Sequence, residues 1–216
     1  MHLLDKLFGN SVRAKVLRLF YVNPDSVFSP KEIARLSKIA PGAASREARY
    51  LLALGFLKSA ARVDERVVER KNKKLKTIRT KIKGFALSKT FPLLLSLRHL
   101  VVTASPVSRE KIIEQFKGKG KVKLVVLGGI FVEDPAQSKI STEEESRLDL
   151  LVVGDAIKKN KVDRFIENLG AEAGKELNWA LMTALEFEQR MSMHDKFLRD
   201  LFDYPHECVI NKLGIE

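Results

Sequence analysis

Cationic side chains are the residues of this chain whose types and spacing point most directly to a chemistry. They are concentrated in residues 66–83 and recur on one side of a segment at 41–54. Lys and Arg neutralise phosphate groups and release the counterions that surround nucleic acids, and Arg also hydrogen-bonds to base edges. The chemistry that these residues indicate is therefore the binding of a polyanion.

Candidate contacts to double-stranded DNA are the polar and cationic residues expected on the exposed sides of these segments. Arg46 and Arg49 would reach base edges or flanking phosphates, and the denser stretch would neutralise phosphates. The complete candidate set is Lys31, Ser45, Arg46, Arg49, Arg66, Arg70, Lys71, Lys73, Lys74, Lys76, Arg79 and Lys81. A plainer interpretation stays open, in which residues 66–83 are a solvated charged strip and Arg46 is an ordinary surface residue.

The net positive charge of the chain comes from its first half. The 216 residues carry a formal net charge of +12. Residues 1–105 contain 22 Lys and Arg against 7 Asp and Glu, whereas the remainder contains 17 against 20. A basic half joined to a slightly acidic half predicts that the first half binds a polyanion while the second performs another task.

His194, His206 and Cys208 raise the question of a metal site in the second half. Their spacing matches no compact ligand motif, so we expect separate structural roles, no metal and no cofactor. A single cysteine excludes an internal disulfide and is typical of a reducing compartment. No apolar stretch approaches the ~20 residues of a membrane helix, and residues 1–13 do not resemble a signal peptide. We therefore expect a cytoplasmic protein with no membrane partner.

Apolar spacing and turn signals divide the first half into short helices. Apolar residues recur every three or four positions in residues 3–8 and 12–20, which predicts two helices. Ser29, Pro30 and Glu32 form a capping-box pattern, in which proline occupies the first helical position. Another helix is therefore expected to begin near Pro30.

A further helix and a hairpin are expected next. Pro41 restarts the chain, and an apolar stripe predicts a helix that ends at Gly55. Alternating residues in 56–70 and 75–87 predict the two strands of a long basic hairpin. This order of elements resembles the winged-helix domains of prokaryotic repressors of the arsenic-repressor type, over roughly residues 3–90. The resemblance implies a third helix in the major groove, and paired DNA half-sites would favour a homodimer.

The second half alternates helical and strand signals, which predicts a mixed α/β fold. The expected helices span 107–116, 158–173 and 192–202, and the expected strands span 122–127, 148–153 and 177–185. The domain division that follows places a winged helix-turn-helix at 1–90, a helical linker at 91–120 and an α/β domain at 121–216.

The two strands at 122–127 and 148–153 and their flanks read LVVLGGIF and RLDLLVVGD. They resemble the minimal nucleotidyltransferases of the DNA-polymerase-beta type. In that family a Gly-Ser pair holds nucleotide phosphate and an Asp-x-Asp binds two metal ions. This chain has Gly128-Gly129 and Arg147-Leu148-Asp149 instead. The resemblance thus implies a catalytically degenerate domain, in which Gly128, Gly129 and Asp149 are nucleotide-binding candidates and no catalytic or metal-binding residue is assigned.

Three functions follow from these expectations. The first is a DNA-binding transcriptional regulator whose second domain serves as a sensor, a dimerisation module or a partner-binding module. The second is a nucleotidyltransferase acting on protein or RNA, which Arg147 disfavours because it puts a fixed positive charge where cations would bind. The third is a protein-binding partner, as the antitoxin-like relatives of minimal nucleotidyltransferases imply.

Overall fold

The structure is a computed structural model that describes residues 3–69, 75–103, 109–116, 121–132 and 148–215. It has the expected mixed α/β class. The chain divides into two compact units, Met1–Val101 and Val102–Glu216. Within the described residues, no helix combines the length and the apolar character that crossing a membrane requires.

Four helices open the first unit, α1 (Leu3–Leu7), α2 (Ser11–Val22), α3 (Pro30–Leu36) and α4 (Pro41–Ala53). Local capping explains where two of them begin. The side chain of Asn10 accepts a hydrogen bond from the backbone of Val12 before α2, and Ser29 caps α3. Proline occupies the first turn of both α3 and α4, where its missing N–H costs nothing.

The core of the first unit lies between these helices. Fully buried side chains include Val16 and Phe20 of α2, Ile33 of α3 and Leu51 of α4. Helix α5 (Leu94–Thr103) follows the hairpin and is attached to α2, since Nε of Arg18 donates a hydrogen bond of 3.3 Å to the carbonyl of Val101. The first unit therefore extends past residue 90 and includes residues 91–101 of the segment 91–120 that the sequence assigned to a linker, while the rest of that segment belongs to the second unit.

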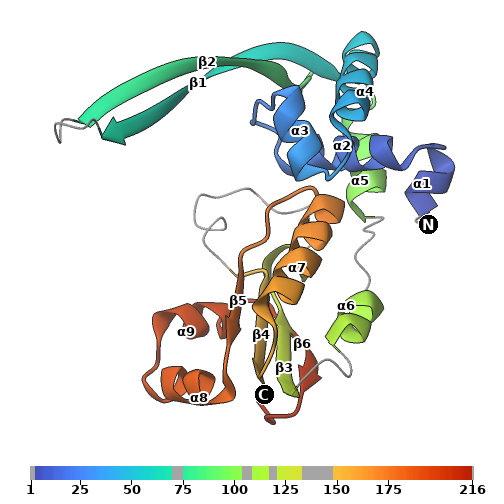
Figure 1. The fold of residues 1–216 in the computed structure, drawn as a ribbon. Coiled ribbons are helices and arrows are strands. Elements are labelled where there is room, and N and C mark those ends of the chain that lie inside the picture. The colour runs from blue at the N-terminus through green and yellow to red at the C-terminus, as the bar shows by residue number, and fades with distance from the viewer. Residues whose placement is uncertain (1–2, 70–74, 104–108, 117–120, 133–147, 216) are drawn as a thin grey trace. The chain divides into compact units, whose positions relative to one another are not determined.

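Strands β1 (Leu57–Glu69) and β2 (Leu75–Leu87) form a long antiparallel hairpin, paired from Leu57 with Leu87 to Glu69 with Leu75. Figure 1 shows the hairpin extending away from α3 and α4. At its base, Phe28 adds a single antiparallel bridge to Phe85. The hairpin is thus attached to the segment that leads into α3.

The second unit is built on a four-stranded sheet in the order β5-β4-β3-β6. Its strands are β3 (Lys121–Leu127), β4 (Leu150–Asp155), β5 (Trp179–Met182) and β6 (Glu207–Asn211). Strand β3 runs antiparallel to both of its neighbours, whereas β4 and β5 are parallel. The near-continuous apolar sequence of β3 and β4 is explained by burial on both faces of the sheet.

Helices cover both faces of this sheet. One core cluster joins Val125 and Val152 to residues of α6 (Arg109–Phe116) and α7 (Lys159–Ala173). The opposite cluster joins Leu151 to residues of α8 (Ala184–Ser192) and α9 (Lys196–Phe202). The second unit is therefore a three-layer arrangement of helices, sheet and helices.

Four elements of the second unit differ from the sequence prediction. The strand expected at 177–185 is shorter, because β5 ends at Met182 and Thr183 caps a new helix by accepting a hydrogen bond from Glu186. That helix, α8, was not predicted, and neither was the edge strand β6. The expected helix at 192–202 corresponds to α9, which begins only after Asp195 caps it.

Candidate nucleic-acid interface

Helix α4 divides into a buried face and an exposed face. Ala44, Ala48 and Leu51 are fully buried, whereas Arg46 and Arg49 are exposed. The spacing of three and four residues places each set on its own side of the helix. The two arginines that the sequence singled out are therefore presented to solvent by a helix whose other side is fixed in the core.

Both arginines of α4 run back toward the amino-terminal end of the helix. Nε of Arg49 donates a hydrogen bond of 3.2 Å to the carbonyl of Ser45. Nη1 of Arg46 lies 3.6 Å from the position that a Cβ would take at Gly42. Helical side chains lean in this direction because of the tilt of the Cα–Cβ bond. The guanidinium groups and the partly exposed Ser45 consequently gather at the first half of α4.

One face of the hairpin carries exposed lysines near its base. Lys81 is opposite Val63, and Lys83 is opposite Ala61. All four residues are exposed, and the side chain of Val63 is 61% exposed. The neighbouring cross-strand pair is Glu65 with Arg79, whose ion pair measures 2.7 Å. The positive charge of Arg79 is thus partly balanced on the protein, while the two lysines extend the basic face toward α3.

A groove of about 570 Å³ lies at the base of the hairpin. Its lining combines the two lysines with small and apolar residues, namely Pro30, Ser59, Ala60, Ala61, Lys81, Lys83, Gly84 and Phe85. Apolar surface next to two ammonium groups matches the alternating sugars and phosphates of a nucleic-acid backbone. The structure therefore brings the start of α3 together with Lys81 and Lys83 of β2.

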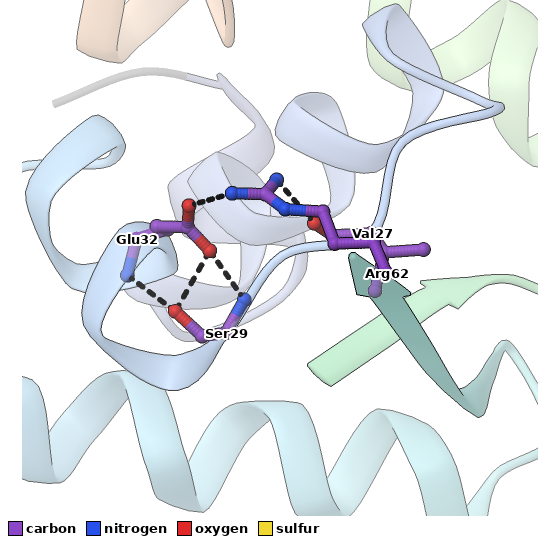
Figure 2. Close-up of polar contacts among 4 residues, drawn as sticks. All are labelled: Val27, Ser29, Glu32 and Arg62. Carbon is purple, nitrogen blue, oxygen red and sulfur yellow. Dashed lines mark hydrogen bonds and ion pairs between the residues drawn. The ribbon is translucent and has the colours of Figure 1, made fainter. Parts of the chain in front are cut away.

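A group of four residues connects the hairpin to the start of α3, as Figure 2 shows. Oε2 of Glu32 accepts hydrogen bonds from the backbone N–H of Ser29 at 2.8 Å and from its hydroxyl at 2.7 Å. Arg62 of β1 donates through Nη2 to Oε1 of Glu32 and through Nη1 to the carbonyl of Val27, the latter at 2.8 Å. The start of α3 and β1 are thereby held by one polar network.

The same network sets the acidity of Glu32. Partial burial raises the pKa of this carboxyl group, but the two hydrogen bonds from Ser29 and the interactions with Arg62 outweigh burial. The pKa of Glu32 is therefore held below its usual value, and the carboxylate is charged wherever the pH is near neutral.

Only some of the other predicted DNA contacts lie in the described part of the chain. Lys31 is exposed on α3. Arg66 and Lys76 belong to β1 and β2, but their side chains lie outside the described part of the chain. The remaining four candidates, Arg70, Lys71, Lys73 and Lys74, also lie outside the described residues. The described candidates occupy α3, α4 and the hairpin.

Two residues of this region are absent from the candidate contacts that were predicted from the sequence. Lys83 shares its face of β2 with Lys81, and the alternation along the strand was the signal that identified this face. Arg62 lies 30 residues from Glu32 in the sequence. No local pattern marks such a pair, because each residue alone resembles many exposed charged residues.

Asp149 of the second unit is enclosed by protein groups. It is 1% exposed, and its carboxylate accepts hydrogen bonds from the backbone of Asn178 at 2.8 Å and of Ile130 at 3.3 Å. Nζ of Lys175 lies 3.4 Å from Oδ1. Burial raises the pKa of Asp149, although the charge of Lys175 and these hydrogen bonds oppose the shift.

The two glycines after β3 leave room for the backbone of Leu148 and for the side chain of Asp149. A Cβ at Gly129 would lie 2.5 Å from Oδ1 of Asp149, and one at Gly128 would lie 2.8 Å from the carbonyl oxygen of Leu148. Gly129 also has a φ of +47°, a conformation that glycine adopts without steric cost. The structure thus places the three nucleotide-binding candidates together, with Gly129 in close contact with Asp149 and with Asp149 turned away from solvent.

No group of three or more His, Cys, Asp or Glu side chains is arranged to hold a metal ion within the described ranges. Comparison of the chain with models of protein families, with curated proteins and with solved structures finds no match.

Proposed function

We propose that the first unit binds double-stranded DNA and that the protein is a transcriptional regulator. The observation that carries this proposal is the exposed pair Arg46 and Arg49 on the outward face of α4, the second helix of a helix-turn-helix arrangement that a hairpin follows. A helix of this kind fits the major groove, where arginine forms paired hydrogen bonds with the O6 and N7 atoms of guanine. In this proposal α4 reads bases.

The hairpin has the complementary task of holding the phosphate backbone. Lys81 and Lys83 are exposed, and both line the groove at the base of the hairpin. Contacts with phosphates supply affinity and position the protein without reading sequence. Together with the charge of +15 carried by residues 1–105, they provide the electrostatic attraction that a DNA-binding protein needs.

For the second unit we propose a regulatory task as a sensor, a dimerisation module or a partner-binding module. It has a separate core on both faces of its sheet. Residues 106–216 also lack the excess of positive charge found in the first half. We propose a homodimer, because paired half-sites multiply the affinity of a small DNA-binding unit, and a cytoplasmic location, where such a protein would meet its DNA.

The proposal is tested by selecting duplexes from a random pool and measuring affinity by fluorescence anisotropy at several salt concentrations. Arg46→Ala is expected to relax the sequence preference at individual positions, at about 1–3 kcal/mol for each lost base contact. Lys81→Ala is expected to weaken binding to all sequences and to reduce the slope of log K against log salt by about 0.9. The two variants thereby separate base reading from phosphate binding.

Lys89→Ala is the matched control. It removes one positive charge outside α4 and the hairpin, from an exposed lysine that pairs with Asp25 at 2.6 Å. Its affinity is expected to stay close to that of the wild type. Failure of the wild type to bind any duplex, or equal losses in Lys89→Ala and Arg46→Ala, would contradict the assignment.

A further inference from the structure

Arg62 is a cation of the hairpin whose hydrogen bonds go to the protein. Its Nη1 donates to the carbonyl of Val27, and its Nη2 donates to the carboxylate of Glu32. The two acceptors lie on either side of Ser29, at the point where the chain enters α3 (Figure 2). The planar guanidinium presents its N–H donors in a rigid fork and so holds both acceptors in a fixed geometry, whereas the ammonium group of lysine is carried on a flexible stem.

The acceptor side of this contact is itself rigid. Glu32 and Ser29 form a complete capping box, in which the side chain of each residue bonds to the backbone of the other. Because Oε2 of Glu32 is occupied by Ser29, the remaining oxygen points to Arg62 from a fixed position. Arg62 therefore binds a preformed acceptor and not a mobile side chain.

Further contacts between this segment and the hairpin involve β2. Phe28 exchanges two backbone hydrogen bonds of 2.9 Å with Phe85. Gly84 lies so close to Phe28 that a Cβ would be 2.3 Å from its carbonyl oxygen. Arg62 adds a connection to β1, the strand that Phe28 does not pair with. Both strands of the hairpin are thus held to the start of α3.

We propose that Arg62 is a positioning residue for DNA binding, which fixes the direction in which the hairpin leaves α3 through its bonds to Glu32 and Val27. The inference rests on the proposed function. Its physical basis is leverage, since the strand extends about 23 Å beyond Arg62 at about 3.3 Å per residue. A rotation of about 10° at the base would then move the far end by about 4 Å, enough to break hydrogen bonds that the far end of the hairpin makes with phosphates.

Glu32→Gln distinguishes positioning from simple electrostatics, because the two predict changes in DNA affinity of opposite sign. Removing a negative charge beside the DNA strengthens binding if only charge matters. Losing the ion pair with Arg62 weakens binding if the pair positions the hairpin, and we expect a loss of about three- to tenfold. Glutamine still completes a capping box, so α3 is expected to keep its start.

Variants of Arg62 complete the test. Arg62→Lys keeps the charge but loses the two-pronged contact, so positioning predicts weaker DNA binding while a plain phosphate contact predicts little change. The double variant Glu32→Gln/Arg62→Gln should bind no more weakly than Arg62→Gln alone, since both changes remove one contact. Additive effects, or tighter binding by Glu32→Gln, would overturn the proposal.

A second measurement does not depend on DNA. Spin labels on cysteines placed at the exposed position Ala53 and at Val68, near the far end of β1, in a Cys208→Ser background, report the distance between α4 and the hairpin. We expect a narrow distribution of distances in the parent protein and a broader one after Arg62→Gln. An unchanged distribution would refute the idea that the bonds from Arg62 to Glu32 and Val27 fix the hairpin. If the parent protein shows the narrow distribution but binds no DNA, the proposed function fails, and the inference about DNA binding fails with it. The structural role of Arg62 in fixing the hairpin would still stand.

Discussion

Nε of Arg13 on α2 donates a hydrogen bond of 2.6 Å to Oε1 of Glu47 on α4, a residue that is 6% exposed. The guanidinium of Arg13 also lies 4.4 Å from the centre of the Tyr50 ring. This hydrogen bond raises the pKa of Arg13, and its effect outweighs partial burial, which lowers the pKa. The helix that presents Arg46 and Arg49 is therefore anchored to α2 through a polar contact as well as through its apolar face.

Replacement of Glu47 by alanine should loosen α4. The change leaves the guanidinium of Arg13 without its closest acceptor, which costs about 1–3 kcal/mol. Hydrogen exchange of the amides of α4 and chemical unfolding followed by circular dichroism measure the loss. Asp25→Ala is the control. The side chains of Asp25 and Lys89 are 77% and 67% exposed, so their ion pair should contribute less than about 1 kcal/mol. Similar losses in both variants would rule out the anchoring role.

Gly84 should tolerate no side chain. A Cβ there would lie 2.3 Å from the carbonyl oxygen of Phe28 and 2.9 Å from the backbone nitrogen of Ser29. Because both neighbours are backbone atoms, Gly84→Ala must separate β2 from Phe28 and should destabilise the unit by about 1–3 kcal/mol. Gly42→Ala is the comparison, since its Cβ would meet only the flexible end of Arg46 at 3.6 Å. The hypothesis of close approach fails if Gly84→Ala is as stable as Gly42→Ala.

Local chemistry decided which features the sequence could reveal. The capping box of Ser29 and Glu32 was predicted and is confirmed, because all of its hydrogen bonds form within four residues. The start of α4 at Pro41 and the hairpin strands were also recognisable from proline position and alternation. In each case the structure depends on neighbours in the sequence.

Features that depend on distant contacts were missed. Strand β6 has five residues, four of them only partly buried, so its apolar alternation is weak, and pairing with β3 defines it. Helix α8 follows β5 after a single residue, Thr183, and its first two residues were read as part of the preceding strand. Arg62 gains its role only when folding brings Glu32 beside it.

The stability of the first unit should decline in acid partly through Glu32. Its folded pKa lies below the usual value of 4.5, so the folded state favours the charged carboxylate. The resulting stability is fully present above pH 4.5 and is lost as the pH falls through the lower folded pKa. Wild type and Glu32→Gln should therefore differ in unfolding free energy near neutral pH and converge at low pH. A constant difference in urea titrations from pH 7 to pH 3 would exclude this linkage.

Asp149 should act as a structural acceptor in the second unit. Asp149→Ala leaves the backbone N–H groups of Asn178 and Ile130 without their acceptor in a buried site, which should cost at least about 2 kcal/mol. Trp179, the single tryptophan, follows directly after Asn178 and makes fluorescence a reporter of unfolding for this unit. Asp203→Ala, which removes a carboxylate 64% exposed, should change stability by less than about 1 kcal/mol. A stable Asp149→Ala variant with an altered nucleotide affinity would instead support the nucleotide-binding interpretation.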